Sequence, residues 1–446
     1  MYENKNIIIL GFARSGYSCA KLLSKNNNVI LVDMKDESNH DKEQIEKLKN
    51  LGVRLELGNQ NEDLLTNNID YLIKNPGIRN DIPFIKKAIS LGIEITNEVE
   101  VAYNLIKDKV NIIGIIGTNG KTTTTTITYK ILKEYYKDRV HLVGNIGYPL
   151  TSIVDKVKKD DIVVMEVSCQ QSVNIKNFHP HVGLLTNLFP AHIDFFENFD
   201  NYKKTKAKMF YNQSESDIAI INLNNEDSIN ELKDIKSIKK YFSSKEKTNC
   251  YLENNSIYCN EEKVIDTDII KIPGTHNLEN IMGAISISKE YNVPNDIISK
   301  VISEFSGVEH RLEYVDTVNG VRFYNDTEAT NIKCTQIALS SFKKPIILIL
   351  GGLERGQDFN DLAPFIDNVK AIIAIGSCRN RVVEFANNNN IPVYDFEFLK
   401  DSFKKITKIM ESGDVVLLSP ASASWDQYKE CEVRGMEFKN LVKEIE

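Results

Sequence analysis

The stretch from Val110 to Thr126, VNIIGIIGTNGKTTTTT, constrains the fold more than any other part of the chain. Its β-branched apolar start, residues 111–116, predicts a buried parallel strand. The strand breaks into Gly117-Thr118-Asn119-Gly120-Lys121-Thr122-Thr123, and a helix is expected to follow. Such a turn directs backbone N–H groups and a helix N-terminus into one pocket, which suits a polyphosphate. The segment therefore predicts an α/β domain that binds ATP.

Each position of this loop has an expected part. Gly117 and Gly120 would let the backbone approach the phosphates without a Cβ in between. Lys121 would neutralise the β- and γ-phosphates, and the Thr122 hydroxyl would coordinate Mg²⁺. The usual spacing asks for glycine at position 115, where this chain has Ile115, so the loop is a variant. A plain Gly/Asn turn with a solvated lysine is the alternative, and the joint presence of strand, glycines, lysine and threonine favours the phosphate loop.

Composition limits the possible classes of function. The chain has 446 residues, enough for two to four domains, with 55 basic and 62 acidic residues and a net charge of −7. This balance argues against broad nucleic-acid binding, and no apolar run approaches the length of a membrane span. The seven cysteines are scattered without a CxxC pair, which is typical of reduced thiols and not of a zinc site. We expect a cytoplasmic α/β protein that binds neither membranes nor nucleic acids.

The N-terminal segment has the order strand, glycine turn, helix, strand. A strand at Ile7–Leu10 runs into GFARSG, residues 11–16, and a second strand at 29–32 ends at Asp33, an acid that could bind a ribose. Ala13 stands where the second glycine of a dinucleotide-binding turn would be. The pattern predicts a Rossmann-like βαβ unit, and it leaves open whether the turn binds a nucleotide or is only structural.

A carboxylate and a lysine stand out in the central segment. The apolar strand at 161–168 carries Glu166 near its end, where a P-loop ATPase places the acid that meets Mg²⁺; a solvated strand-end glutamate is the alternative. In the helix expected at 201–211, Lys206 shares the apolar face of Tyr202, Met209 and Phe210. Such a lysine either extends its amine to water or, near a nucleotide site, is desolvated and reactive.

The region 224–271 is polar, and we expect surface hairpins and loops there. Four strand candidates then predict a second doubly wound sheet, at 320–324, 346–350, 371–375 and 414–418. Polar turns follow these strands, so we expect a second substrate site at their carboxyl ends. Trp425, the one tryptophan, is expected to pack beneath its loop.

Taken together, GTNGKTTT, the His192 segment, Lys206, EHR at 309–311 and SPASASWDQY from Ser419 resemble the Mur ligase family. These ATP-dependent enzymes add amino acids to the UDP-linked peptidoglycan precursor. The motifs GFARSGYS, NPGI, NDTEATN and GGLERGQDF most resemble the members that add D-glutamate to UDP-N-acetylmuramoyl-L-alanine. The resemblance implies three α/β domains: a Rossmann-like domain for the UDP-substrate at 1–100, a central P-loop-type ATPase domain at 101–304, and a Rossmann-like amino-acid-binding domain at 305–446.

The resemblance also implies roles for individual residues. The UDP-substrate would be held by Ser15, Asp33, Gly77, Asn145 and His192. The ATP phosphates would be held by Gly117, Thr118, Asn119, Gly120, Lys121, Thr122 and Thr123, and the remainder of ATP by Asn277, with less support for Asn280, and by Arg311 and Asp326. Two Mg²⁺ ions would be coordinated by Thr122, Glu166, His192 and Lys206 as a carbamate. D-Glutamate would be bound by Thr330, Arg355 and Ser424.

The implied reaction transfers a phosphoryl group to the substrate carboxylate, and the amine of D-glutamate then attacks the acyl phosphate. Lys121, Glu166, His192 and Lys206 would be the catalytic residues, in a monomer whose partners are small molecules. The chain departs from the family pattern at five positions: Gln170, Ala191, Glu328, Arg355 and Ser422. Glu328 is the most consequential, since it reverses the charge of the usual lysine beside Asp326.

Other functions remain as alternatives. Another Mur ligase or a folylpolyglutamate synthase would share the phosphate loop, but the first-domain turn and the SPASASWDQY segment argue against the synthase. A non-catalytic nucleotide-binding module would tolerate loss of the ligand set, which is intact here. A Rossmann oxidoreductase is disfavoured by Ala13 and by the separate phosphate loop.

Overall fold

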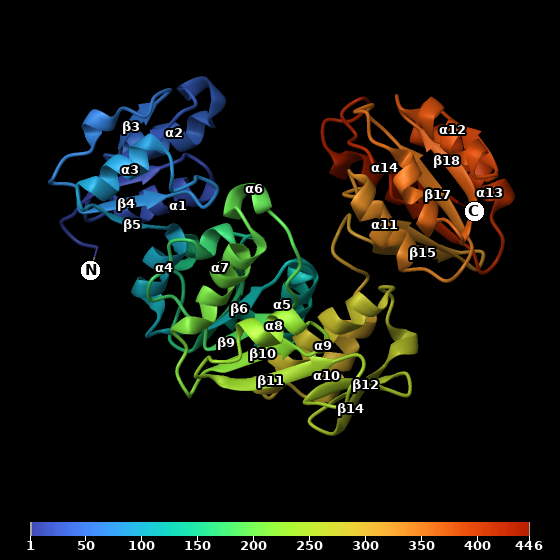
Figure 1. The fold of residues 1–446 in the computed structure, drawn as a ribbon, viewed down its shortest axis with the longest axis horizontal. Helices are drawn as coiled ribbons and strands as arrows, with labels where there is room; N and C mark the ends of the chain where they lie inside the picture. Colours follow the sequence, from blue (N-terminus) through green and yellow to red (C-terminus); the bar gives the residue numbers. More distant parts are fainter. Residues whose placement is uncertain (1, 446) are drawn as a thin grey trace. The chain divides into compact units, whose positions relative to one another are not determined.

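A computed structural model describes residues 2–445, which form two compact units (Figure 1). The first unit comprises Met1–Ile265 with Glu279–Val301, and the second comprises Asp266–Leu278 with Ile302–Glu446. Two β-sheets lie in the first unit and one in the second. The α/β class expected from the sequence is confirmed, and the domain boundaries at 100 and 304 stay a prediction.

The N-terminal sheet is parallel and has the strand order β3-β2-β1-β4-β5. Its strands are β1 (Asn6–Leu10), β2 (Asn28–Asp33), β3 (Arg54–Leu57), β4 (Tyr71–Lys74) and β5 (Glu94–Thr96). The accompanying helices are α1 (Arg14–Leu23), α2 (Lys42–Asn50), α3 (Pro83–Ser90) and α4 (Glu98–Ile106). The order reverses at β1, and ligands of open α/β sheets bind at such switch points.

The central sheet has nine strands in the order β14-β13-β12-β11-β10-β9-β6-β8-β7. Its first strands are β6 (Val110–Ile116), β7 (Val140–Gly144), β8 (Asp161–Glu166), β9 (Val182–Leu185) and β10 (Ile218–Asn222). The helices of this region are α5 (Lys121–Tyr136), α6 (Ile193–Phe196), α7 (Phe199–Tyr211), α8 (Glu226–Glu231), α9 (Thr275–Glu290) and α10 (Asn295–Glu304). Since β6 lies between β8 and β9, the carboxyl ends of all three meet at the phosphate loop.

The region 224–271 extends this sheet. It contributes β11 (Ile238–Ser243), β12 (Cys250–Glu253), β13 (Ser256–Cys259) and β14 (Glu262–Asp266). The expected hairpin is present as β12–β13, but the expectation of loops is wrong for β11, which pairs parallel with β10. This strand escapes notice because its sequence, IKKYFS, has two lysines in the middle.

The sheet of the second unit is mixed and has the order β15-β16-β20-β17-β18-β19. Its strands are β15 (Glu313–Val318), β16 (Val321–Asn325), β17 (Ile346–Gly351), β18 (Val369–Ile375), β19 (Val393–Asp395) and β20 (Val415–Leu418), and its helices are α11 (Ile332–Ser340), α12 (Arg379–Asn388), α13 (Leu399–Ile409) and α14 (Cys431–Lys443). All four predicted strands are present. The edge strand β15, antiparallel to β16, is an addition.

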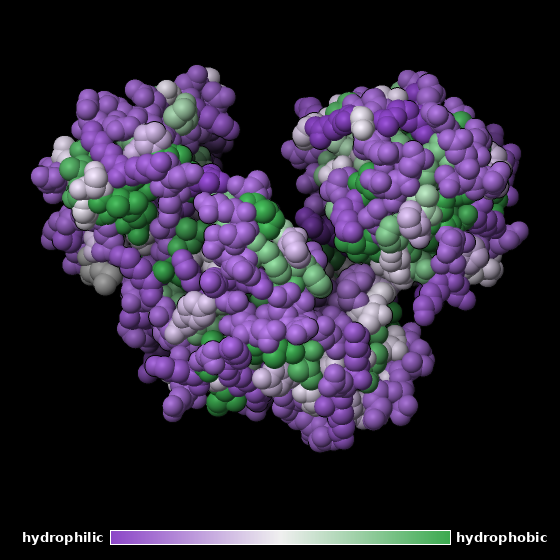
Figure 2. Space-filling model, viewed as in Figure 1, coloured by the Kyte–Doolittle hydropathy of each residue, from purple (hydrophilic) through white to green (hydrophobic). Residues whose placement is uncertain are grey.

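Apolar runs fill both faces of the parallel strands, as parallel sheets covered on two sides require. Every residue of β8, β9, β17 and β20 is buried. Hydrophilic residues predominate on the face seen in Figure 2, with apolar residues in smaller patches between them. Within residues 2–445, no helix combines the length and the apolar character needed to cross a membrane.

Candidate nucleotide and substrate sites

The phosphate loop joins β6 to α5 through residues 117–120, as the sequence predicts. Gly120 caps α5 in the left-handed conformation, with φ of +80°. The first backbone N–H groups of a helix have no partner four residues earlier, so those of Lys121, Thr122 and Thr123 are directed at the loop's concave side. This local geometry can bind a phosphate.

The two glycines of the loop are required by packing as well as by the backbone. A Cβ on Gly117 would lie 1.9 Å from the Thr186 hydroxyl, and one on Gly120 would lie 2.0 Å from Asn280 Oδ1. The sequence argument attributed these glycines to the approach of phosphates. The structure gives a further reason, since a side chain at either position would collide with the protein itself.

Residues after β9 fix the shape of the loop. Asn187 accepts the Thr118 N–H through its carbonyl at 2.8 Å and the Asn119 N–H through Oδ1 at 2.9 Å. Thr186 donates its hydroxyl to the Asn119 carbonyl at 2.6 Å. Sequence reasoning missed both residues, because nothing local in the sequence indicates that β9 lies beside β6.

The Lys121 ammonium donates to the Thr118 carbonyl at 2.9 Å, so it is held at the mouth of the loop. Thr122, on the first turn of α5, is half-buried. On the other side of the loop, the Thr118 hydroxyl is 3.1 Å from the Tyr202 hydroxyl and accepts the Phe189 N–H at 3.0 Å. The loop is thus hydrogen-bonded to two later segments before any ligand binds.

Glu166 ends β8 and is 1 % exposed, which excludes the solvated strand-end alternative. Its Oε1 accepts the Asn145 amide at 2.7 Å, whereas its Oε2 is buried and has no hydrogen-bond partner. A buried carboxylate oxygen without a donor is costly unless a cation or a ligand satisfies it. The structure thus joins Asn145 to Glu166, a contact that the sequence did not predict. The carboxylate oxygen without a donor fits a Mg²⁺ ligand.

Lys206 is buried on α7, at 2 % exposure. Its Nζ donates to the Gly117 carbonyl at 2.7 Å and lies 4.6 Å from the centre of the Tyr202 ring. Burial, together with the nearby Lys121 charge, lowers the pKa of Lys206 to about 7, against the opposing effects of Cys169 and Glu166. Lys206 is therefore desolvated, and the alternative of an amine extended into water is wrong.

His192 precedes α6 with a left-handed backbone, φ +52° and ψ +36°, and its side chain is exposed. Its ring centre is 6.3 Å from that of Tyr202, the residue that also contacts Thr118 and Lys206. Within residues 2–445, no three His, Cys, Asp or Glu side chains cluster as a metal site.

A cleft of about 360 Å³ within the first unit brings three of the predicted UDP-substrate residues together. Ser15, Gly77 and Asn145 all line this cleft, and the buried side chain of Glu98 lines it as well. Burial raises the pKa of Glu98 to about 7, although the Thr151 N–H, which donates to it, acts in the opposite direction. Sequence reasoning did not identify Glu98, because an acidic residue in the first turn of a helix is common and indicates no binding site.

Asp33 does not line this cleft. Its Oδ2 accepts the Phe12 N–H at 2.5 Å and its Oδ1 accepts the Lys35 N–H at 2.8 Å. The carboxylate thereby holds the turn between β1 and α1. The turn itself needs Gly16, because a Cβ there would lie 1.9 Å from the Gly11 carbonyl oxygen.

In the second unit, Asp326 follows β16 and is 8 % exposed. It accepts the Ser419 hydroxyl at 2.8 Å and the Leu312 N–H at 3.1 Å, yet burial raises its pKa to about 7. The unusual Glu328 forms an ion pair with Arg311, 2.6 Å between Oε2 and Nη2. The carboxylate that replaces the usual lysine is therefore neutralised by Arg311, a residue expected to bind the nucleotide.

Two other residues predicted to bind ligands in this unit make hydrogen bonds to nearby backbone groups. Asn277 donates its amide to the Pro273 carbonyl at 2.6 Å. The Thr330 N–H donates to the Glu328 carbonyl at 2.8 Å. Ser424 is 1 % exposed, and its buried hydroxyl oxygen has no hydrogen-bond partner.

Arg355 lies on the loop after β17, with its guanidinium 4.6 Å from the centre of the Trp425 ring. Trp425 is 63 % exposed, so the prediction that it packs beneath its loop is wrong. The ring instead lies against the cation expected to bind D-glutamate. Sequence reasoning did not find this pair, since the two residues are 70 positions apart.

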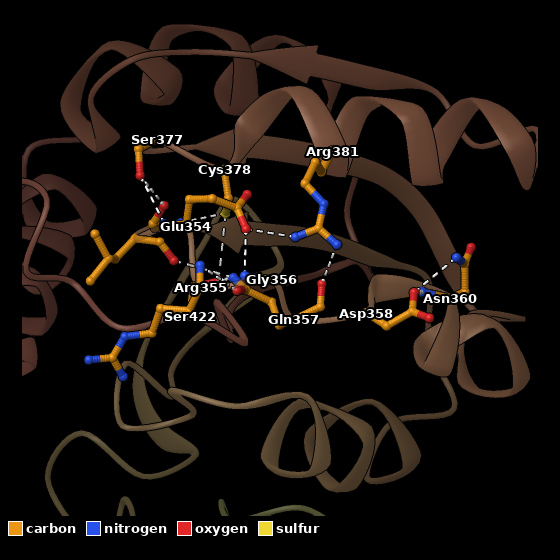
Figure 3. Close-up of polar contacts among 12 residues, drawn as sticks. Glu354, Arg355, Gly356, Gln357, Asp358, Asn360, Ser377, Cys378, Arg381 and Ser422 are labelled. Atoms are coloured by element: carbon orange, nitrogen blue, oxygen red, sulfur yellow. Dashed lines mark hydrogen bonds and ion pairs between the residues drawn. The ribbon is translucent and has the colours of Figure 1, made fainter.

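Arg381 holds the same loop in shape (Figure 3). It donates to Glu354 Oε1 at 2.7 Å and to the Gln357 carbonyl at 2.7 Å, on either side of Arg355. The Gln357 amide then donates to the Ser422 hydroxyl at 2.5 Å. The Arg355 side chain points away from Arg381 in this view. Arg381 therefore holds the backbone of the loop and leaves the Arg355 guanidinium directed elsewhere.

Known proteins match the chain along its whole length. Residues 5–97 match the MurD-like N-terminal domain of Mur ligases, 115–288 the Mur ligase middle domain, and 310–422 the Mur ligase glutamate ligase domain. The chain is 38% identical to the UDP-N-acetylmuramoylalanine–D-glutamate ligase of Geobacillus sp. (strain WCH70), covering 100% of this chain and 98% of that one. It is 39% identical to the enzyme of that name from Enterococcus hirae, covering 99% and 97%.

Solved structures agree on the fold. The UDP-N-acetylmuramate–alanine ligase MurC of Thermotoga maritima matches with a TM-score of 0.59 at 18% identity, over 98% of this chain and 99% of that one. MurF ligase of the same organism, solved with ADP, matches with a TM-score of 0.57 at 17% identity, over 99% and 96%. Identities of 38–40% to enzymes of nearly equal length, with all three domains matched, show that this chain belongs to the Mur ligase family.

Proposed function

We propose that the chain is an ATP-dependent ligase that joins D-glutamate to UDP-N-acetylmuramoyl-L-alanine, with ADP and phosphate as the other products. Two supports combine: full-length similarity to enzymes named for this reaction, and a phosphate loop beside a buried carboxylate and a buried lysine. The single observation that carries the chemistry is the unpartnered Oε2 of Glu166, since it marks a place for a cation at the end of β8.

ATP would bind with its phosphates against the N–H groups that open α5. Lys121 would leave the Thr118 carbonyl and neutralise the terminal phosphates, and Gly120 would keep the backbone open. Mg²⁺, when bound, would offset the charge of the transferring phosphoryl group. Thr122, Glu166 and His192 are the residues that would hold the ions, and we propose that two ions bind.

We further propose that Lys206 is carbamylated. A neutral amine is the form that attacks CO₂, and a pKa of about 7 supplies that form at neutral pH. The reaction joins the nitrogen of the neutral amine to the carbon of CO₂ and releases one proton, so a neutral group becomes an anion. The remaining N–H can still donate to the Gly117 carbonyl, and the new charge would face the cations of the site.

The UDP-substrate would occupy the cleft lined by Ser15, Gly77 and Asn145. Asn145 donates to Glu166, so the substrate's reacting end would be adjacent to the phosphate-binding groups. D-Glutamate would be bound in the second unit by Thr330, Arg355 and Ser424, with Arg355 as the cation for a carboxylate. Water must be excluded while the acyl phosphate exists, or hydrolysis would compete with the attacking amine.

As partners we propose only these small molecules, bound by a monomer in the cytoplasm. No further protein, nucleic acid or membrane partner is needed for the reaction.

The test is phosphate release from ATP in the presence of UDP-N-acetylmuramoyl-L-alanine, comparing D-glutamate, L-glutamate, L-lysine and no amino acid. The proposal expects release that requires both the UDP-substrate and D-glutamate. Release driven by another amino acid would retain the ligase mechanism and overturn the specificity. An absence of release with every amino acid would overturn the catalytic function.

A further inference from the structure

Two of the seven cysteines face each other across a hairpin that lies outside the sites described above. Strands β12 and β13 are joined by Asn254 and Asn255, which have φ of 46° and 59°. Two consecutive left-handed residues are the mark of a type I′ turn, which fixes the register of a two-residue hairpin. In that register Cys250 is directly opposite Cys259.

The type of pairing at this position favours a bond between the sulfurs. In an antiparallel pair, hydrogen-bonded and non-hydrogen-bonded residue pairs alternate. The Asn260 N–H donates to the Asn249 carbonyl at 2.8 Å, so the neighbouring pair Cys250–Cys259 is non-hydrogen-bonded. Such pairs have Cα atoms about 4.5 Å apart, and disulfides span about 4.4–6.8 Å between Cα atoms. Side chains of directly opposed residues also point to the same face of the sheet.

The surroundings differ from those of the other cysteines. Cys250 and Cys259 are 0% and 2% exposed. A hydrogen bond from the Cys250 thiol, aided by the charges of Lys289 and Lys240, holds the pKa of Cys259 below its usual range, against burial and Glu290. Burial raises the pKa of Cys250. Among the seven cysteines, Cys259 is the one whose pKa is lowered, because the other five lack this neighbouring thiol and are raised by burial.

We propose that Cys250 and Cys259 are a reversible redox pair that forms a disulfide across β12 and β13 when a small peroxide is the oxidant. The Cys259 thiolate attacks one peroxide oxygen, and the other oxygen leaves as water after taking up a proton, so that Cys259 becomes a sulfenic acid. The Cys250 thiol then attacks that sulfur, forms the S–S bond and releases a second water. Two thiols are oxidised and one hydrogen peroxide is reduced to two waters. A dithiol reductant reverses the reaction.

The product would close the open end of the hairpin at the edge of the central sheet. This part of the sheet packs near α9, since Ser286 hydrogen-bonds to Cys250 and Lys289 affects Cys259. Lys289 is itself paired with Glu262 at 2.9 Å, and Lys240 with Glu290 at 2.6 Å. The pair is thus a covalent modification site that shares no residue with the proposed ATP and substrate sites.

The test treats the reduced full-length protein with hydrogen peroxide, alkylates it in denaturant, and measures the intact mass and a peptide map. We expect five alkylated thiols instead of seven, a loss of two mass units before alkylation, a peptide cross-link between Cys250 and Cys259, and recovery of seven thiols after dithiothreitol. Alkylation of both Cys250 and Cys259 after peroxide treatment, or a cross-link at another pair, would overturn the proposal.

Variants separate the two steps. Cys250→Ser should leave a sulfenic acid at Cys259 that dimedone traps, whereas Cys259→Ser should leave Cys250 alkylatable. Cys334→Ser, at a half-buried cysteine outside the hairpin, is the matched control and should still lose two thiols. Should the Cys250→Ser or Cys259→Ser protein fail to fold, the wild-type peptide map alone decides the question. A Cys334→Ser variant that no longer forms the cross-link would count against the pair.

Discussion

Lys206 offers the sharpest test of the structure, because its burial should make it a source of instability that depends on pH. The structure predicts that Lys206→Met increases the free energy of unfolding at pH 7 while it abolishes most ligase activity. Methionine has a similar length and fills the same apolar space beside Tyr202 and Phe210 without a charge. The gain should be greatest at neutral and lower pH and should turn into a loss in alkali.

The magnitude follows from the pKa of Lys206. Its fall from 10.5 to about 7 corresponds to an upper limit of about 5 kcal/mol, at about 1.36 kcal/mol per pKa unit. The variant loses the hydrogen bond to the Gly117 carbonyl and the ring contact with Tyr202, which together offset about 2–3 kcal/mol. The net gain expected at pH 7 is therefore about 2 kcal/mol.

The sign of the pH dependence is fixed by proton binding. Between pH 7 and 10.5 the unfolded chain keeps the Lys206 proton and the folded chain has released it, so wild-type stability rises with pH in this window. Below pH 7 both states are protonated and the full cost of the buried charge is present. The stability of the variant relative to wild type should therefore fall by about 3 kcal/mol between pH 7 and pH 9.5, from a gain of about 2 kcal/mol to a loss of about 1 kcal/mol.

Urea unfolding of both proteins in CO₂-free buffer at several pH values would measure this difference. Lys204→Met is the matched control: the residue is exposed on the same helix, so its stability change should stay within about 0.5 kcal/mol at every pH. A difference between Lys206→Met and wild type that does not change from pH 7 to pH 9.5 would refute the reasoning. The same result would remove the physical support for carbamylation.

Other substitutions test the remaining groups. Glu166→Gln should lower kcat by about 10²–10³-fold, the usual cost of a lost electrostatic ligand, and should raise the Mg²⁺ concentration for half-maximal phosphate release; an unchanged Mg²⁺ dependence would count against a metal role. Trp425→Ala should raise the KM for D-glutamate about two- to fivefold without affecting that for ATP, because an exposed cation–π contact contributes about 0.5–1 kcal/mol; Trp425→Phe should behave nearly as wild type, and an unchanged KM in both variants would show that Arg355 needs no support. Glu328→Gln should release Arg311 and lower the KM for ATP by up to about fivefold, since exposed ion pairs contribute about 0–1 kcal/mol; a raised KM measured in the same titration would show that Glu328 helps to bind the nucleotide.

The features that the sequence predicts well are those set by a few consecutive residues. The strand, turn and helix around GTNGKTT are local, and so is the helical spacing that places Lys206 among apolar side chains. Glu166 was identified from the end of an apolar strand, since the carboxyl ends of parallel strands meet at one edge of the sheet. In each case the pattern and the position of the residue come from the same short segment.

The features that the sequence did not reveal depend on which strands are neighbours. Asn187 holds the phosphate loop only because β9 pairs with β6, and the two segments are about 70 residues apart. Arg381 on α12 likewise fixes a loop that precedes it by more than 20 residues. Side chains that make such long-range hydrogen bonds cannot be recognised from the residues around them, because the order of strands in the sheet determines which segments become neighbours.

The sequence also could not show the long-range partner of Glu328, and its effect on nucleotide binding was therefore overestimated. From the sequence, a carboxylate in place of a lysine beside Asp326 implies repulsion of a nucleotide. The structure pairs Glu328 with Arg311, and the two side chains are 30% and 57% exposed. An ion pair this exposed contributes only about 0–1 kcal/mol, so separating Arg311 from Glu328 would cost little. If Arg311 binds the nucleotide as proposed, we therefore expect Glu328 to change the affinity for ATP only within a narrow range.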